Sequence, residues 1–282
     1  MTPLREKMID AMRLRGFSQR THESYLYAVN RLANHYHQPP DRLTPDQLQA
    51  FFLYLVKQRK LSAATCRLYL NGIRFFYLQV LQWPSLTVTL TVPKRPQRIP
   101  ELLTREEVGR IINACENPKH RMMLITCYGC GLRVSELVSI KVTHIDGERK
   151  LLRVEQGKGG KDRLVTLSDG LLQQLRGYWR ASHPTVYLFP RYRPDRALSV
   201  TTAQKAFTQS KRQAGIEKVG GIHALRHAYA THLLAGGLPV QQLQQQLGHR
   251  DIHSTLRYVH WIPDYRQAQG PRDLVAQLGL PS

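Results

Sequence analysis

Four side chains suited to phosphate chemistry lie within one stretch of the chain, residues 221–260. They are His223, Arg226, His249 and Tyr258. A tyrosine can attack a phosphodiester and leave again, because a phenolate is a tolerable leaving group. An arginine can fork onto two phosphate oxygens and stabilise the added negative charge of the transition state. These residue types predict covalent chemistry on a phosphodiester, with the histidines binding the phosphate or tuning the tyrosine.

An upstream motif supplies a second arginine. Residues 131–137 read GLRVSEL and contain Arg133, which could bind the same phosphate as Arg226. A purely structural interpretation is also open, because Arg133 could simply form a salt bridge with Glu136. Paired arginines would make a metal ion unnecessary, and no acidic cluster of the kind that holds Mg²⁺ is evident.

A glycine-rich segment between the two motifs supplies a proton donor. The sequence GKGGK, residues 157–161, predicts a turn between two short strand-like runs, 150–156 and 162–167. The leaving 5′ oxygen of DNA needs a proton, which a lysine can give. Lys158 and Lys161 are the two candidates, and whichever does not act on the oxygen could contact a backbone phosphate.

The order of these motifs resembles that of the tyrosine recombinases, the family of Xer proteins and phage or transposon integrases. The resemblance is sharp over roughly residues 120–262. It implies that Tyr258, nine residues after His249, is the nucleophile rather than Tyr229 or Tyr265. It also implies Lys158 over Lys161 as the catalytic lysine. The extra histidines have no matching role, and we expect them to be structural or exposed: His227, His232, His253 and His260.

The same resemblance implies how such an enzyme works. Two copies bind each double-stranded recombination site, and a homo-tetramer pairs two sites, with an accessory or sister recombinase as a further partner. Strands exchange through 3′-phosphotyrosyl intermediates without metal, ATP or another cofactor, for DNA integration and excision or for dimer resolution. The tail would dock into a neighbouring protomer or pack on its own domain. A non-catalytic sequence-specific DNA-binding protein and a topoisomerase-like nicking and rejoining enzyme are the alternative functions.

The composition of the chain limits the classes of partner and ligand that it can bind. The 282 residues carry 41 Lys and Arg against 20 Asp and Glu, a formal net charge of +21, which favours a nucleic acid partner. No run approaches the roughly 18 apolar residues of a membrane helix, so we expect a cytoplasmic protein without a membrane partner. Cys127 and Cys130 form a C-x-x-C, but no second ligand pair lies nearby, and buried structural thiols are the favoured interpretation.

The elements that carry this chemistry divide into two predicted domains. Residues 1–90 predict a helical, SAM-like core-binding bundle, with helix starts at Ser18, Thr44 and Ser62. In its first long helix Tyr25, Tyr27, Val29, Leu32 and Ala33 are expected to form the apolar stripe. Prolines within 91–102 predict a basic, extended linker, and Thr104 with Glu107 predicts the capped start of the next helix. Residues 103–282 are the expected catalytic domain, with a tail from about 259.

Basic residues follow the bundle and the linker. Residues 47–100 contain no Asp or Glu, so cations on shared helix faces suit a phosphate backbone. The expected DNA contacts, together with Lys161, are Lys57, Arg59, Lys60, Arg67, Arg74, Lys94, Arg95 and Arg98. The predicted fold class is mainly α with a small β-sheet in the catalytic domain, arranged as a two-domain clamp.

Overall fold

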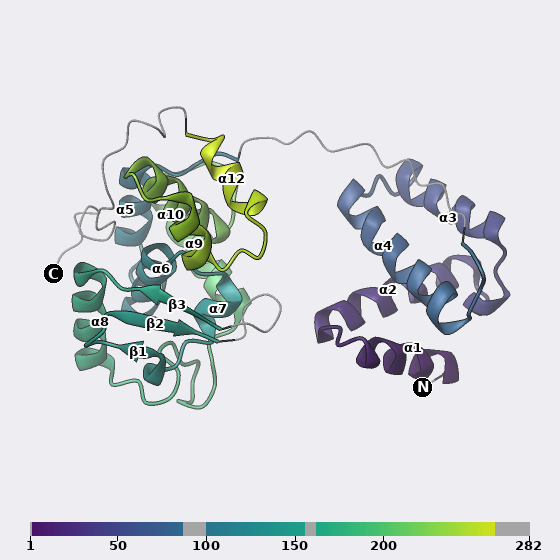
Figure 1. Ribbon diagram of the computed structural model, residues 1–282, viewed down its shortest axis with the longest axis horizontal. Helices are drawn as coiled ribbons and strands as arrows, with labels where there is room; N and C mark the ends of the chain where they lie inside the picture. Colours follow the sequence, from purple (N-terminus) through teal and green to yellow (C-terminus); the bar gives the residue numbers. More distant parts are fainter. Residues whose placement is uncertain (1, 87–99, 156–161, 263–282) are drawn as a thin grey trace. The chain divides into compact units, whose positions relative to one another are not determined.

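The computed structural model describes residues 2–86, 100–155 and 162–262. The chain forms two compact units, residues 1–98 and 99–282. Both are mainly helical, and the second holds one small sheet (Figure 1), which confirms the predicted fold class. Within the described residues no helix is both long enough and apolar enough to cross a membrane.

The described residues of the first unit, 2–86, form a bundle of four α-helices. They are α1 (Pro3–Leu14), α2 (Gln19–Tyr36), α3 (Pro45–Lys57) and α4 (Ala63–Phe75), with a short 3₁₀ turn at Pro40–Arg42 and a π-helical turn at Phe76–Val80. Side-chain caps start three of them as predicted. Ser18 and Ser62 accept from the amides of Thr21 and Thr65, and Thr44 forms a full capping box with Gln47.

Close packing of α2 on α4 organises the core of this bundle. Gly72 permits the approach, because a Cβ there would lie 3.0 Å from the Cα of Tyr25. Val29 and Leu32 are buried as expected, but Tyr27 is 56% exposed, and that part of the predicted stripe is wrong. Tyr27 follows Tyr25 by two residues, and two residues on an α-helix point to nearly opposite sides. The run Phe75, Phe76 and Tyr77 is buried in this core.

In the second unit a central helix is wrapped by others. Helix α6 (Pro118–Cys130) packs against α5 (Arg105–Asn113), α7 (Val134–Val138), α8 (Asp169–Ser182), α9 (Val200–Gln213) and α10 (His223–Ala235). Its side chains from Met122 to Tyr128 are all buried. The capping box of Thr104 and Glu107 starts α5, which confirms that prediction. Gly131 ends α6 in the left-handed region at φ +58°.

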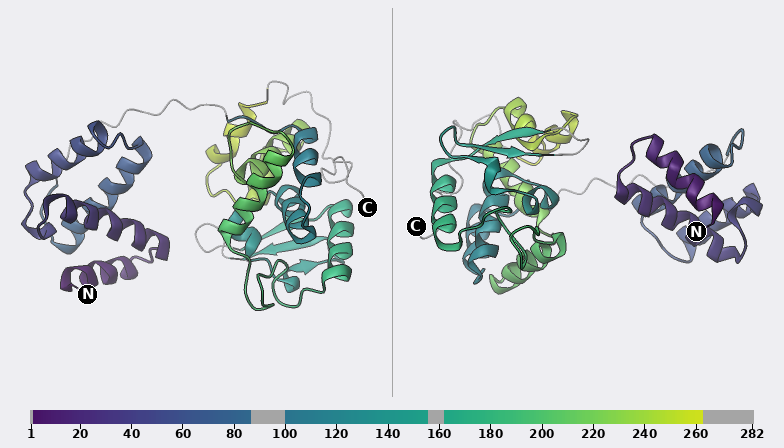
Figure 2. Two further views of the ribbon diagram at one scale, coloured as in Figure 1. Left: turned by 180° about the vertical axis from the view of Figure 1, so that it is seen from behind. Right: turned by 90° about the horizontal axis from the view of Figure 1, so that it is seen from below.

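Three short antiparallel strands form the sheet in the order β1-β2-β3, drawn in the lower half of the second unit in Figure 1 and in the left view of Figure 2. They are β1 (Ile145–Asp146), β2 (Leu151–Val154) and β3 (Arg163–Thr166), and Val154 pairs with Arg163. Strands β2 and β3 are the two runs expected from the sequence, whereas β1 was not predicted. The turn that contains Lys158 and Lys161 lies outside the described residues.

Two short helices complete the unit. Helix α11 (Val240–Leu247) packs against β3 and α10, and α12 (His253–Val259) packs against α10 and α11. In Figure 1 and the left view of Figure 2, α12 lies in the upper half of the unit. Residues 183–199 connect α8 to α9 without a regular helix or strand. The tail beyond 262, including Tyr265, lies outside the described residues.

Candidate active site

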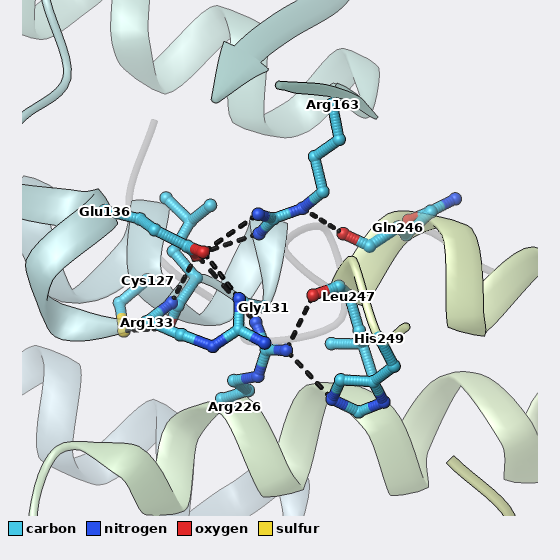
Figure 3. Close-up of polar contacts among 10 residues, drawn as sticks. Cys127, Gly131, Arg133, Glu136, Arg163, Arg226, Gln246, Leu247 and His249 are labelled. Atoms are coloured by element: carbon cyan, nitrogen blue, oxygen red, sulfur yellow. Dashed lines mark hydrogen bonds and ion pairs between the residues drawn. The ribbon is translucent and has the colours of Figure 1, made fainter. Parts of the chain in front are cut away.

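Glu136 is the centre of a buried cluster of arginines (Figure 3). Arg163 donates two hydrogen bonds to its carboxylate, from Nη1 at 2.9 Å and from Nη2 at 2.8 Å. Arg133 donates from Nη1 at 2.6 Å and from its backbone amide at 2.9 Å. Burial by itself would raise the pKa of Glu136, but the hydrogen bonds and charge of Arg163, followed by those of Arg133, lower it to about 2. The carboxylate is therefore ionised at neutral pH and holds Arg133 at the start of α7.

Arg133 thus forms a salt bridge with Glu136, as the purely structural interpretation of this arginine predicts. Its side chain is nevertheless 23% exposed, against 4% for Glu136. Arg133 also lines a pocket of about 320 Å³ together with Arg226. The salt bridge and a phosphate-binding role are therefore compatible, because the bridge orients a guanidinium that still reaches the pocket.

Arg226 is fixed by backbone carbonyl groups. Its side chain is 1% exposed, and it donates from Nη1 to the carbonyl of Gly131 and from Nη2 to that of Leu247, both at 2.7 Å. These acceptors lie at the C-terminal ends of α6 and α11, where carbonyls lack helical partners and favour a cation. Burial, then the charge of Arg133, lowers the pKa of Arg226 to about 10, so it stays charged at neutral pH.

Arg163 uses the same helix end. Its Nε donates to the carbonyl of Gln246 at 2.8 Å, one residue before the Leu247 carbonyl that binds Arg226. Two arginines therefore join the end of α11 to β3 and α10. The sequence analysis predicted a role neither for Arg163 nor for the carbonyl of Gln246 that it binds.

The partners of His249 determine its tautomer. Its Nε2 lies 3.0 Å from Nη2 of Arg226, which can only donate, so Nε2 accepts. The ring proton then lies on Nδ1, which donates to Oγ1 of Thr255 at 2.8 Å. Burial, followed by the charges of Arg226 and Arg133, lowers the pKa of His249 to about 4. At neutral pH His249 is a neutral residue with both ring nitrogens engaged.

Tyr258 lies on α12 at the wall of the same pocket and is 4% exposed. Its ring stacks on that of His249, with centroids 6.3 Å apart and planes 6° from parallel. Trp261 packs edge-on against it at 5.1 Å. Burial raises the pKa of the phenol, and the nearby charges of Arg226 and Arg257 only partly oppose this. Tyr258 therefore keeps its proton at neutral pH.

The pocket collects five of the six expected catalytic residues, which come from the N-cap of α7, from α10 and α12, and from the loop after α11. The sixth, Lys158, lies outside the described residues. His223 lines the pocket at the first residue of α10, and partial burial with the charges of Arg226 and Arg133 lowers its pKa. The full lining is Arg133, His223, Arg226, His227, Gly248, His249, Arg250, Asp251, Ser254, Arg257 and Tyr258.

His227 departs from its expected role as an exposed or purely structural histidine. It lines the pocket, and its Nδ1 lies 3.1 Å from the phenolic oxygen of Tyr258. Its position four residues after His223 places both on one face of α10, and that spacing was the signal available in the sequence. His232 does pack structurally, with ring nitrogens 2.9 Å from Oη of Tyr128 and 3.0 Å from the carbonyl oxygen of Leu103.

The rival nucleophile Tyr229 lies in the core. It is 2% exposed, and its hydroxyl donates a hydrogen bond to Oε1 of Gln246 rather than to a catalytic residue. Cys127 and Cys130 are fully buried free thiols, in agreement with the structural interpretation. Within residues 2–86, 100–155 and 162–262, no three His, Cys, Asp or Glu side chains gather as a metal site would require.

The expected DNA-binding cations within residues 2–86 lie at the surface of the first unit. All five described members of the expected DNA-binding set are exposed: Lys57, Arg59, Lys60, Arg67 and Arg74. Arg67 and Arg74 are seven residues apart on α4 and so share a face of that helix. The ion pair described within residues 2–86 joins Arg13 to Asp10 and involves none of the five. Lys94, Arg95, Arg98 and Lys161 lie outside the described residues.

Comparison with known proteins gives two family matches. Residues 101–263 match the phage integrase family, and residues 4–85 match the phage integrase N-terminal SAM-like domain. A putative integrase/recombinase, y4qK of Sinorhizobium fredii, is 39% identical over 261 residues, which cover 92% of this chain and 84% of that protein. Tyrosine recombinase XerA of Pyrococcus horikoshii is 30% identical over 257 residues, covering 90% and 87%.

Two solved structures are similar along most of the chain. The crystal structure of XerA recombinase is 25% identical, with a TM-score of 0.55 and 99% of each chain covered. A lambda integrase (75–356) dimer bound to a COC′ core site is 19% identical, with a TM-score of 0.71 and coverage of 89% and 95%. The second likeness concerns the fold alone.

Proposed function

The chain belongs to the phage integrase family, and on that premise we propose that it is a site-specific DNA recombinase whose nucleophile is Tyr258. The supporting observation is the convergence of Arg133, Arg226, His223, His249 and Tyr258 on one pocket. Such a pocket presents positive charge and a tyrosine to the same small volume, which is what covalent catalysis on a phosphodiester requires.

In the proposed reaction the phenolic oxygen of Tyr258 attacks the scissile phosphate, forming a 3′-phosphotyrosyl bond and releasing a 5′ hydroxyl. Arg133 and Arg226 stabilise the negative charge that develops on the phosphate oxygens. Because Glu136 and backbone carbonyls already orient both guanidinium groups, little reorganisation is needed when the phosphate arrives. Lys158 protonates the departing oxygen, and the reverse reaction rejoins the strand to a new partner.

The partner is a double-stranded recombination site. We assign the first unit, with its exposed Arg67 and Arg74, to backbone contacts, and propose that the two units close around the duplex as a clamp. Pairing of two sites by a homo-tetramer, the docking role of the tail and action in the cytoplasm belong to the same proposal. Integration, excision and dimer resolution are all served by this chemistry.

The test begins with a site that the protein selects itself. Purified Tyr258→Phe protein, which should bind without cutting, enriches duplexes from a random-sequence pool. Nicked versions of these duplexes then meet the wild-type chain in EDTA, and denaturing gels reveal covalent protein–DNA adducts. We expect adducts with wild type and none with Tyr258→Phe.

Matched tyrosine variants identify the nucleophile. Tyr192→Phe changes a tyrosine that is 90% exposed in the same unit, and Tyr265→Phe removes the rival in the tail. Both should keep the adduct. An adduct that persists in Tyr258→Phe, or its absence in wild type on a duplex that is demonstrably bound, would overturn the proposal. Adducts without recombinant products on two-site substrates would instead indicate a nicking and rejoining enzyme.

A further inference from the structure

The proposed function leaves the proton of Tyr258 without a destination. A phenol that attacks phosphorus must lose its proton, and burial of Tyr258 raises its pKa rather than lowering it. A proton acceptor must therefore lie within hydrogen-bond reach of the phenolic oxygen, about 2.6–3.2 Å.

His227 meets the distance requirement. A hydrogen bond of 3.1 Å joins its Nδ1 to the phenolic oxygen of Tyr258. Packing fixes the ring, because Trp261 contacts His227 edge-on at 5.6 Å and Tyr258 at 5.1 Å. His223, one helical turn earlier, also packs edge-on against it, with ring centroids 4.5 Å apart. The imidazole is therefore held on the phenol by aromatic neighbours on two elements, α10 and the end of α12.

The other neighbours of Tyr258 are poorly suited to accept a proton. His249 already accepts from Arg226 with one ring nitrogen and donates to Thr255 with the other. Its ring lies parallel to that of Tyr258, with centroids 6.3 Å apart. Arg226 has only donors.

His227 is also in the right charge state. Burial, followed by interactions with His223 and with the positive charges of Arg226 and Arg257, lowers its pKa to about 4, so the ring is neutral at neutral pH. In the tautomer with its proton on Nε2, Nδ1 is free to accept the phenolic proton. A DNA phosphate in the pocket would bring negative charge beside Arg226 and Arg257. That charge raises the pKa of His227 toward the ordinary imidazole value of about 6.5, which makes it a better base when substrate is bound.

We propose that His227 is a catalytic residue that takes the phenolic proton of Tyr258 during cleavage and returns it during rejoining. As the bond between Oη and phosphorus forms, the bond from phosphorus to the 5′ oxygen breaks, and the proton moves from Oη to Nδ1. The departing oxygen takes its proton from a separate acid. In rejoining, a 5′ hydroxyl attacks and gives its proton to the conjugate base of that separate acid, while the released phenolate recovers its proton from Nδ1. This inference rests on the proposed function of the same site.

The first experiment measures adduct formation on the nicked duplex under single-turnover conditions. We expect His227→Ala to slow the wild-type rate by on the order of 10²–10³-fold, the usual contribution of a positioned general base. His227→Asn should lose about as much, because its side-chain oxygen can accept a hydrogen bond but is far too weak a base to take the proton. DNA affinity should stay within about twofold. His183→Asn is the control, since His183 is exposed and adopts φ 42°, which asparagine tolerates.

A second pair of measurements separates proton transfer from packing. Fluorinated tyrosine at position 258 has a more acidic phenol and needs a base less, so the His227→Ala defect should shrink to below about tenfold. A defect that merely reflected lost packing would persist. A substrate with sulfur in place of the leaving 5′ oxygen needs no acid, and it should leave the His227→Ala defect unchanged.

The outcomes separate this inference from the proposed function. No wild-type adduct on a bound duplex refutes the function itself. Wild-type adducts with an unaffected His227→Ala rate refute only the role of His227. Rescue by the sulfur substrate would place His227 on the leaving oxygen and also overturn the inference. If His227→Ala fails to fold, the fluorotyrosine comparison in His227→Asn carries the same test.

Discussion

Replacing Glu136 by glutamine removes the charge at the centre of the arginine cluster while keeping its shape. The carboxylate is 4% exposed and accepts from Arg163 and Arg133, with Arg226 at 3.9 Å. In the Glu136→Gln variant these three guanidinium groups face one another without an anion. Removing one partner of a buried ion pair costs about 3–5 kcal/mol, because the remaining charges stay buried.

The pKa of Glu136 gives an independent magnitude. A fall from 4.5 to about 2 corresponds to about 3 kcal/mol, at about 1.4 kcal/mol per pKa unit. Because the folded pKa lies below the unfolded value, this stability is present above pH 4.5 and is lost as pH falls toward 2. Wild type and Glu136→Gln should therefore differ by about 3 kcal/mol at pH 7. By pH 4 the difference should narrow by about 1 kcal/mol.

Urea unfolding followed by tryptophan fluorescence measures this difference. In a Trp83→Phe background the signal comes from Trp179 and Trp261, both in the second unit, so unfolding of the first unit does not interfere. Glu148→Gln is the matched control, because Glu148 is exposed and its loss should change stability by no more than about 0.5 kcal/mol. If Glu136→Gln unfolds at the wild-type urea concentration, or the gap keeps its full size down to pH 4, the charge of Glu136 does not hold the cluster together.

Two further expectations concern DNA binding and the thiols. Arg67→Ala and Arg74→Ala should each lower the slope of log Kd against log salt concentration by about 0.9, because each variant loses one phosphate contact. Arg13→Ala is the control and should keep the slope, since Arg13 is paired with Asp10. Fluorescence anisotropy over a salt series measures the slope, and an unchanged slope in both α4 variants would show that α4 does not contact DNA. All four cysteines are buried, and burial raises the pKa of Cys127 to about 12, so Ellman's reagent should label none rapidly in the native chain and four in urea. Fast labelling of a native thiol would show that the core around α6 opens.

Local signals in the sequence were the most reliable guides to the fold. The helix starts at Ser18, Thr44, Ser62 and Thr104 were all predicted correctly, because a capping side chain bonds within three residues of its own position. Strand β1 has only two residues, too few for an alternating pattern to register. It exists because it pairs with β2, which is a tertiary effect.

The residues of the candidate site also fall into those that local sequence signals identified and those that only the folded structure reveals. Arg133, Arg226, His249 and Tyr258 were found through motifs, in which residue type and spacing carry the information. Arg163 could not be found so, because its partners are a carboxylate from α7 and a backbone carbonyl from α11, and only the folded chain brings these together. His227 had a signal in its spacing from His223, but the sequence did not reveal that α12 places Tyr258 against it.

Anchoring Arg226 and Arg163 on main-chain oxygens changes where the chain is vulnerable to mutation. A substitution at position 246 or 247 changes the side chain but leaves the backbone carbonyl in place. The hydrogen bonds that these carbonyls accept from Arg163 and Arg226 can therefore persist in such variants. The sensitive positions are instead the glycines that set the backbone path. A Cβ at Gly131 would lie 2.3 Å from the ring of Tyr229, and one at Gly248 would lie 2.8 Å from Arg163, both at positive φ. A screen for inactivating substitutions should therefore recover Gly131 and Gly248, which have no side chain, ahead of Gln246 and Leu247.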